Sequence, residues 1–431
     1  MAAKLKRWHS WKGYIEMDWQ SLTEKLRKMG VQVGLEKPLD STGKISRPIE
    51  RVVAGREVAT HYGSIFSSDH HYQADYLHGN QPIIPTQPIS RIAQWARVPQ
   101  LESESLENLI FLDTETTGLS GGTGTMAFMV GVGRYRASEF VMEQFFLREP
   151  ADEAALLAGL SEFCDSMGAV VTYNGKAFDI PILNTRYILQ GFTSPFEDLP
   201  HFDLLHLTRR VWKARLEHCN LGNIEQQVLD LRRGGDEVPG YLVPEYYSQY
   251  LRNGDAQPLK GIFYHNELDV LSLAALFALL TDILGNPIEW QNPCYQDITS
   301  VGRLLEKMGN LDQASEMYQK GAVIENTGTL RLEPVLYQAR LLKKNQQLEL
   351  ALPLWMQAAE VRSLEALEEL AKYYEHTLKD PKLALSFVDQ AISQLETDPH
   401  LPGMNKYLLA FTHRKTRLLT KMGGTATETS D

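Results

Sequence analysis

The stretch LIFLDTETTGLSGGTGT, residues 109–125, places two acidic side chains at the end of an apolar run. Residues 109–112 predict a buried β-strand, and Asp113 and Glu115 follow where that strand should end. Because they are two residues apart on an extended chain, their side chains point to one face. Neighbouring carboxylates raise each other's pKa unless a cation lies between them. The pattern therefore predicts a metal site, with a solvated turn as the alternative.

Two further acids occupy similar places later in the chain. Asp179, in the stretch YNGKAFD, follows an apolar strand and lies near its carboxyl end or on the first turn of the next helix. Asp269, in YHNELD, lies on a strongly apolar helix, where a charge is costly unless it is paired or coordinated. Carboxylate oxygens are the ligands that Mg²⁺ and Mn²⁺ prefer, and we expect two such ions. Two ions about 3.5–4 Å apart can stabilise both the attacking and the leaving oxygen of a phosphodiester.

The residues around these acids alternate between strand and helix, which predicts an α/β sheet with helices on its faces. Apolar runs predict strands at 109–113, 126–135, 140–147 and 169–174, and helical periodicity predicts helices at 151–167, 176–191 and 265–285. The helix at 176–191 should end at a glycine.

Three motifs, FLDTETTG (111–118), VTYNGKAFDIPIL (171–183) and YHNELDVLSLAAL (264–276), resemble in order and spacing those of the DEDD superfamily of 3′–5′ exonucleases. The wider sequence looks like the bacterial YprB-like family, which couples such a domain to TPR-like helices. The resemblance implies an α/β ribonuclease-H-like exonuclease domain with a mixed sheet and helices on both faces. It also implies that two metal ions are held by Asp113, Glu115, Asp179 and Asp269.

The position of the general base departs from the superfamily pattern. That pattern has a His five residues before the last Asp, or a Tyr four before it, whereas this chain has Tyr264 five before and His265 four before Asp269. A helix through this segment puts His265 one turn from Asp269 on the same face. An imidazole also accepts a proton near pH 7 more readily than a phenol does. We expect His265 to be the base, with Tyr264 as the alternative.

A basic cluster with an aromatic residue is the predicted nucleic-acid contact. The stretch TRRVWKAR contains Arg209, Arg210, Trp212, Lys213 and Arg215, and Arg232–Arg233 follow. Backbone charge contacts combined with base stacking are typical of single-strand binding. A solvated helix face is the alternative.

Other polar motifs allow two interpretations each. Asn174 resembles a superfamily position near the substrate, and a turn-forming role is equally open. Asp203, with His201 and His206 in HFDLLHL, could support the site from behind the metal ligands, and capping of a helix is the interpretation we favour. Gly118 and Gly121 predict a tight turn rather than a phosphate loop, because no GxxxxGK[ST] pattern is present. The basic stretch KLKRWHSWK, residues 4–12, is a candidate nucleic-acid arm.

The C-terminal sequence is helical and repeats. Ala314, Ala351 and Ala384 occupy equivalent places in three segments, at spacings of 37 and 33 residues, close to the 34 of a TPR. Such arrays form concave surfaces for protein partners, which are the docking partners we expect. A plain helical bundle is the alternative. The last helix, within 406–422, is basic and is a second candidate for nucleic-acid contact.

Composition limits the class of protein. The 431 residues carry a formal net charge of −11, so bulk charge gives no support for nucleic-acid binding. Three distant cysteines argue against a disulfide framework, and we expect a cytoplasmic protein with no membrane contact. The predicted parts are an N-terminal extension, partly helical or irregular (1–107), the exonuclease domain (108–285), TPR-like repeats (295–422) and a disordered tail (423–431). The extension should contain a helix at 18–30 and a proline-rich arm at 79–89.

The expected activity is hydrolysis of single-stranded DNA or RNA from the 3′ end. Two other functions fit the same sequence. A non-catalytic scaffold would keep the fold and bind a partner through the helical repeats, and an endonuclease would use the same fold in another cleavage mode.

Overall fold

The protein is described from a computed structural model. The structure describes residues 47–118, 124–137, 139–234, 238–291, 293–323, 331–397 and 404–423. Residues Met1–Ser46 form a unit separate from Arg47–Asp431, and only the second is described here. The predicted basic arm at 4–12, the helix at 18–30, Gly121 and the tail beyond Gly423 therefore lie outside the described residues.

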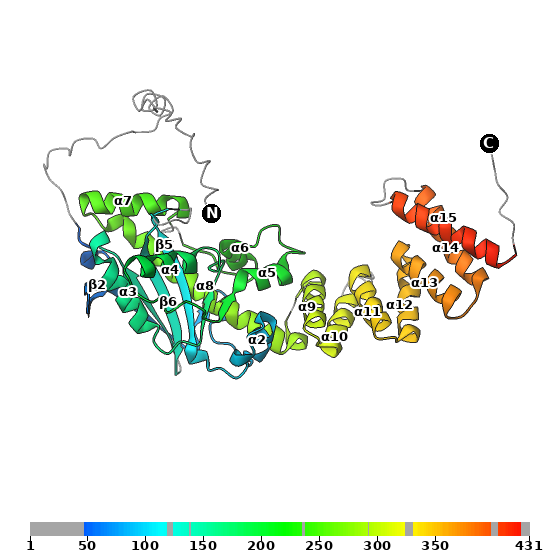
Figure 1. Cartoon of the computed structure of the whole chain (residues 1–431), viewed down its shortest axis with the longest axis horizontal. Coiled ribbons are helices and arrows are strands. Elements are labelled where there is room, and N and C mark those ends of the chain that lie inside the picture. Colours follow the sequence, from blue (N-terminus) through cyan, green and yellow to red (C-terminus); the bar gives the residue numbers. More distant parts are fainter. Residues whose placement is uncertain are drawn as a thin grey trace, which may run out of the picture. The chain divides into compact units, whose positions relative to one another are not determined.

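A seven-stranded mixed sheet forms the centre of the α/β part of the chain (Figure 1). Its strand order is β1-β2-β7-β6-β5-β8-β9. The first five strands in this order pair antiparallel, whereas β5–β8 and β8–β9 pair parallel. The strands are β1 (Arg56–Thr60), β2 (Gly63–Gln73), β5 (Leu109–Thr116), β6 (Ala127–Arg136), β7 (Glu139–Phe146), β8 (Ala169–Thr172) and β9 (His201–Asp203). The mixed α/β sheet predicted from the sequence is confirmed.

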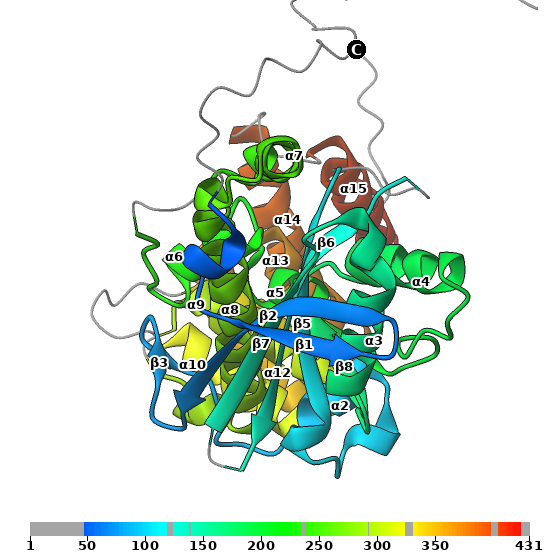
Figure 2. The same cartoon turned by 90° about the vertical axis from the view of Figure 1, so that its left-hand side faces the viewer.

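Helices cover both faces of this sheet (Figure 2). They are α2 (Ser90–Ala96), α3 (Glu153–Phe163), α4 (Asp179–Leu189), α5 (Leu204–Trp212), α6 (Leu221–Gln227), α7 (Val243–Asn253) and α8 (Lys260–Gly285). Helix α4 ends before Gly191, which has φ of +74°, as the glycine predicted.

Alternation along β5 assigns its side chains to the two faces. Leu109 and Phe111 pack in the core with α2, α5 and α8, whereas Ile110 and Leu112 pack with α3, α4 and α7. Side chains on a strand alternate with a period of two, so Asp113 continues the α8 face. Thr114 continues the α4 face in the same way. The strand thus directs its acids toward α8 before any side-chain contact is considered.

The segment before residue 108 differs from the expected extension. β1 and β2 form one edge of the main sheet, and β2 pairs with β7 over Phe66–Gln73. The proline-rich stretch at 79–89 packs on α8 through Ile83, which is fully buried, and includes part of a short ribbon of β3 (Leu77–His78) and β4 (Gln81–Pro82). The sequence interpretation missed β2 because Ser67 and Ser68 are buried beside Ile65 and Phe66, so apolar and polar residues do not alternate along this part of the strand.

Helix α8 is the long apolar helix expected from the sequence, beginning five residues earlier than predicted. The stretch Gln257–Gly285 is long and apolar enough to cross a membrane by length and composition, with a mean hydropathy of 1.9. The hydropathy value belongs to an 18-residue window within this stretch, and 78% of that window is buried in this structure. Its apolar residues pack on the sheet, which accounts for their number.

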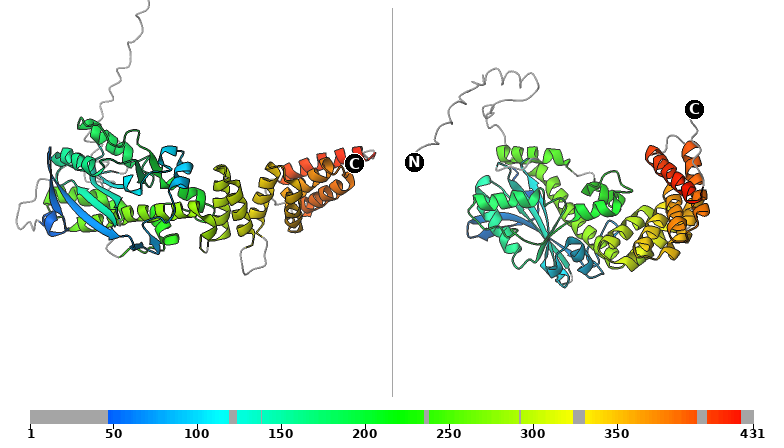
Figure 3. Two further views of the ribbon diagram at one scale, coloured as in Figure 1. Left: turned by 90° about the horizontal axis from the view of Figure 1, so that it is seen from below. Right: turned by 45° about the vertical axis from the view of Figure 1, so that its right-hand side comes forward.

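The C-terminal part is all-helical, and consecutive helices pack side by side (Figure 3). The helices are α9 (Tyr295–Lys307), α10 (Leu311–Ala322), α11 (Leu332–Lys344), α12 (Leu348–Glu360), α13 (Leu364–His376), α14 (Pro381–Thr397) and α15 (Met404–Lys421). Ala314, Ala351 and Ala384 each stand fourth in α10, α12 and α14, and each is fully buried. The equivalence predicted from their spacing is therefore present, and assignment to the TPR class stays a prediction.

Two features of this region bear on function. The core that α8 forms with the sheet continues into α9 and α10 through Ile298, Val301 and Met317.

The basic residues of α15 are largely engaged in ion pairs, because Arg414 and Arg417 both pair with Glu375 of α13. Glu375 is buried, which raises its pKa, but Arg417 and Lys421 outweigh this effect and lower the pKa to about 2.

Candidate active site

Asp113 is held by an amide from α8. The Nδ2 of Asn266 lies 2.9 Å from Asp113 Oδ2, and Asn266 is fully buried. Gln144 of β7, also buried, donates to Asn266 Oδ1 at 2.9 Å and to the Phe263 carbonyl at 2.8 Å. A chain of amides thus fixes one carboxylate oxygen in place.

Asp179 begins α4 and receives a hydrogen bond from Thr114 Oγ1 at 2.5 Å. The loop that leads into it is ordered by Asp203, whose carboxylate accepts from the backbone N–H of Asn174 at 2.8 Å and of Lys176 at 3.3 Å. Asp203 also caps α5 by accepting from Leu205 N, as expected for this motif. One buried carboxylate therefore sets the path of the chain from β8 to Asp179.

Asp269 faces an arginine that was not expected at this site. The guanidinium of Arg233 binds Asp269 Oδ1 and makes two bonds of 2.6 Å to Glu225 of α6. Glu225 is buried and also accepts from Ser272 at 2.5 Å. The positive charge next to Asp269 is thus that of Arg233, which lies in the loop after α6.

The acids influence one another's ionisation. Burial raises the pKa of Asp113 well above its usual range, and the charges of Asp269, Asp179 and Glu115 raise it further. The pKa of Glu115 is raised well above its usual range for the same reasons, although Arg233 opposes the shift. Burial raises the pKa of Asp179 to about 6 against the hydrogen bond from Thr114. The cluster therefore lacks positive charge even with Arg233 present.

The donor chemistry of this cluster fits hard divalent cations. All four side chains offer carboxylate oxygens, the ligands that Mg²⁺ and Mn²⁺ take. The raised pKa values of Asp113, Glu115 and Asp179 show that positive charge is lacking around them. Within the described residues, no three His, Cys, Asp or Glu side chains form a group that could hold a metal ion as the structure stands. In this structure the position next to Asp269 Oδ1 is occupied by the guanidinium of Arg233.

His265 faces the acids, and both its ring nitrogens have polar neighbours. Its Nε2 lies 3.4 Å from Asp269 Oδ2 and 4.0 Å from Glu115 Oε1, as expected one helical turn from Asp269. Its Nδ1 lies 2.9 Å from Arg233 Nη1. Because a guanidinium only donates, Nδ1 must accept, and the neutral ring then carries its proton on Nε2. Tyr264 instead lines a pocket with Gly234.

Two comparisons with known proteins identify the family of this chain. A family model described as RNase_H superfamily matches residues 110–281, which include all four acids. An uncharacterized protein YprB of Bacillus subtilis (strain 168) is 34% identical over 293 residues, which cover 66% of this chain and 69% of the relative. The chain belongs to the YprB family. The superfamily points to nuclease activity in general and to divalent metals as the usual cofactors of such enzymes.

The predicted nucleic-acid residues of this YprB-family chain have different surroundings. Trp212 is 1% exposed in the core beside Val211, so its predicted role in base stacking is wrong. The reason is the amphipathic register of α5, which turns this residue toward α8. Arg215 is held by Asp297 of α9 at 2.9 Å, so it joins two elements rather than standing free for phosphate.

The other predicted contacts remain on the surface. Arg209 and Arg210 are exposed and line a common pocket, and Lys213 lines two pockets beside it while donating to the Glu217 carbonyl. Asn174 has φ of +67°, which is the turn-forming role left open by the sequence, and it also lines one of these pockets.

Four residues of the site were missed by sequence reasoning. Asn266 and Gln144 carry no charge and lie in apolar elements, so no pattern set them apart. Glu225 lies outside every motif of the exonuclease superfamily. Arg233 was grouped with the basic cluster around Arg209, although its side chain turns toward Glu225 and Asp269. A buried polar residue on an otherwise apolar helix was the available indication for Asn266.

Proposed function

We propose that this protein is a metal-dependent nuclease that hydrolyses single-stranded DNA or RNA from the 3′ end. The observation that supports the proposal is that Asp113 and Glu115 of β5, Asp179 at the start of α4 and Asp269 of α8 lie close together, with raised pKa values for the first three. A scaffold has no use for such a cluster, because uncompensated buried acids destabilise the fold.

The roles of the residues follow from their positions. Two divalent cations held by the four acids would activate the attacking water and stabilise the leaving oxygen. Asn266 and Thr114 orient Asp113 and Asp179 for this task. His265 is the proposed proton acceptor. Its Nε2 can accept a proton only in the tautomer that carries the ring proton on Nδ1. That tautomer requires that Arg233 no longer donates to Nδ1. Binding a metal at Asp269 and freeing the base thus depend on the same arginine.

The C-terminal helices are proposed to dock a protein partner. The repeated helix pairs with small residues at equivalent buried positions are the observation behind this role. This function is secondary to the nuclease and does not depend on it.

One assay tests the activity. Purified protein is incubated with Mn²⁺ or Mg²⁺ and single-stranded DNA or RNA labelled at the 5′ end, with the 3′ end free or blocked. We expect a ladder that shortens from the free 3′ end and stops when the end is blocked or the metal is chelated. The Asp113→Asn variant is the control for contaminating nuclease and should give no ladder.

The alternatives give different outcomes. Internal cleavage of a blocked substrate would show an endonuclease on the same fold. Intact substrate with every metal, in protein that is folded by its melting curve, would favour the scaffold and contradict the proposal.

A further inference from the structure

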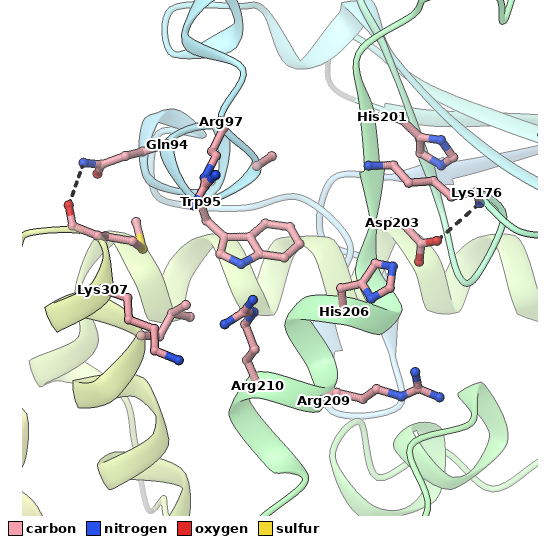
Figure 4. Close-up of a pocket in the computed structure, with 13 residues that line it drawn as sticks. Gln94, Trp95, Arg97, Lys176, His201, Asp203, His206, Arg209, Arg210 and Lys307 are labelled. Atoms are coloured by element: carbon pink, nitrogen blue, oxygen red, sulfur yellow. Dashed lines mark hydrogen bonds between the residues drawn. The ribbon is translucent and has the colours of Figure 1, made fainter.

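A pocket lies between three elements that are tied together by side chains. Its volume is about 1030 Å³, and α2, α5 and α9 form its walls (Figure 4). Arg215 at the end of α5 pairs with Asp297 of α9. Gln94 of α2 donates to the Met308 carbonyl at 3.3 Å, and Arg91 donates to Asn310 Oδ1 at 2.5 Å. These bonds hold α2, α5 and α9 in place relative to one another, so the packing of the fold itself forms the pocket.

Five cations line this pocket, and none of them has an ion pair within the described residues. They come from four parts of the chain: Arg97, Lys176, Arg209, Arg210 and Lys307. Elsewhere on the described surface arginines do find carboxylates, as Arg47 does with Asp255 and Arg148 with Glu57. In a protein of net charge −11, five exposed and unpaired cations around one pocket form a local positive surface that would attract an anionic ligand.

Asp203, the acid that lines the pocket, does not offset the charge of these five cations. Asp203 is buried, and its oxygens accept from the backbone N–H of Asn174, Lys176 and Leu205. His201 adds no positive charge at neutral pH, because burial and Lys176 lower its pKa to about 4. The pocket is therefore strongly positive where a ligand would enter it.

An aromatic ring projects among these cations. Figure 4 shows the indole of Trp95 pointing from α2 into the pocket, between Lys307 and Arg210 on one side and His206 on the other. The ring is half-buried, so one part of it stays available for contact. Cations that follow a backbone, together with a ring on which a base stacks, are the combination that single-stranded nucleic acid requires.

The pocket adjoins a second pocket, which lies at the start of the loop that leads to Asp179. Arg209 lines this pocket and also one that contains Asn174 and Tyr173, at the end of β8. The chain runs from there to Asp179, along the loop that Asp203 orders. On the other side, Arg303 and Lys307 of α9 extend the positive surface.

We propose that the strand being cleaved leaves the active site through this groove, with a base stacked on Trp95 and its phosphates on Arg209, Arg210 and Lys307. The proposal rests on the nuclease function and extends it: the first helix of the C-terminal region, α9, belongs to the nucleic-acid surface. An acidic peptide would satisfy the cations, but it has no base to stack on Trp95.

Binding without cleavage tests the groove separately from the activity. Fluorescent single-stranded 20-mers of DNA and RNA are titrated into the full-length protein in a chelator, and anisotropy is read at several salt concentrations. The double variant Arg210→Gln/Lys307→Gln should bind more weakly. Its salt dependence should be flatter by a log–log slope of about 1.4, because each lost phosphate contact removes about 0.7 for single strands. Lys382→Gln, an exposed lysine of α14, is the matched control and should bind as the parent does.

A second variant tests the ring. Trp95→Leu should weaken binding by about 5- to 100-fold, the usual range for loss of one stacked base, whereas Trp95→Phe should recover most of the affinity. The salt slope should stay that of the parent, because no charge is lost. Melting curves of both variants separate this effect from a loss of folding, which matters because Trp95 also packs on the core.

The outcomes distinguish the groove from the nuclease proposal. Tight binding that the groove variants weaken, in a protein that cleaves nothing, would uphold the groove and overturn the activity. Cleavage by a protein whose groove variants bind and cleave like the parent would overturn the groove alone. Poly-glutamate binding that depends on Arg210 and Lys307, without binding of either oligonucleotide, would assign the pocket to an acidic protein partner and also overturn it.

Discussion

Asp113 is the residue on which the candidate site depends most. It is buried, three other acids raise its pKa, and only Asn266 opposes the shift by a hydrogen bond. Asp113→Asn should abolish cleavage, because it removes a ligand common to both proposed metals. The same change should raise the melting temperature of the metal-free protein, since one member of a repelling cluster is gone. Glu102→Gln, which changes an exposed acid, should alter neither property. Undiminished cleavage by Asp113→Asn would exclude this site.

The raised pKa of Asp179 sets the pH dependence of stability without metal. An unfolded Asp titrates near 4, and Asp179 titrates at about 6 in the folded protein. Between these values the folded state binds more protons, so its stability should fall as pH rises, at up to about 1.4 kcal/mol per pH unit for this group. Melting temperatures measured in a chelator from pH 4 to 6.5 check the sign. A rise in stability across this window would mean that the acids are already compensated.

Two variants decide whether His265 or Tyr264 is the general base. His265→Ala should lower the rate by about 10²–10⁴-fold, the usual contribution of a general base, while metal binding largely remains. Tyr264→Phe should cost much less, because Tyr264 lines a separate pocket and loses only its hydroxyl. Single-turnover rates measure both. A large loss in Tyr264→Phe beside a near-parental His265→Ala would reverse the assignment.

At the scale of elements, a glycine brings β6 and α8 close enough to build the site. Gly131 pairs with Asp113 on one side and with Gln144 on the other, and the Asn266 amide lies over it. A Cβ at this position would stand 2.1 Å from Asn266 Oδ1. The missing side chain therefore leaves the space in which Asn266 joins the two flanking strands.

Gly131→Ala should displace Asn266 and with it Asp113. We expect activity to fall by about 10- to 100-fold, as for other losses of a residue that orients a metal ligand, and stability to fall by about 1–3 kcal/mol from overpacking. Gly240→Ala is the matched control, because a Cβ there meets nothing within 4 Å. Nuclease rates and urea unfolding measure the two effects. Equal activity of both variants would show that Asn266 does not position Asp113.

This arrangement also shows what the sequence could and could not predict. Periodicity was enough to predict β5, α4 and α8, because it is a local pattern. The role of Asp113, Glu115, Asp179 and Asp269 as metal ligands rests on the family resemblance and stays a prediction. Asn266 over Gly131 depends on the register of three strands, which no local pattern encodes. Arg233 and Trp212 were misplaced because the direction of a side chain depends on the register of its element against the core.

At the scale of the whole molecule, the sheet and the helical region share part of one core. Ile298, Val301 and Leu305 of α9 and Met317 of α10 are buried in the same cluster as α5 and α8, whereas α12 to α15 form a second cluster together with most buried residues of α11. The boundary predicted near residue 290 therefore falls inside a hydrophobic core. The groove at Lys307 depends on this packing, because α9 is its third wall.

Two truncations test this dependence. A chain that ends at residue 290 loses α9 and α10 and exposes the apolar surfaces of α5 and α8 that they cover, whereas a chain that ends at Val323 keeps both helices. Because burying apolar surface contributes about 25 cal/mol per Å², the longer chain should melt at a higher temperature and stay monodisperse, and the shorter one should associate. The longer chain should also keep the affinity of the groove for single strands, since Arg210, Lys307 and Trp95 remain. Equal melting temperatures for the two chains would show that the sheet needs no support from the helical region. The groove would then have to be sought on α2 and α5 alone.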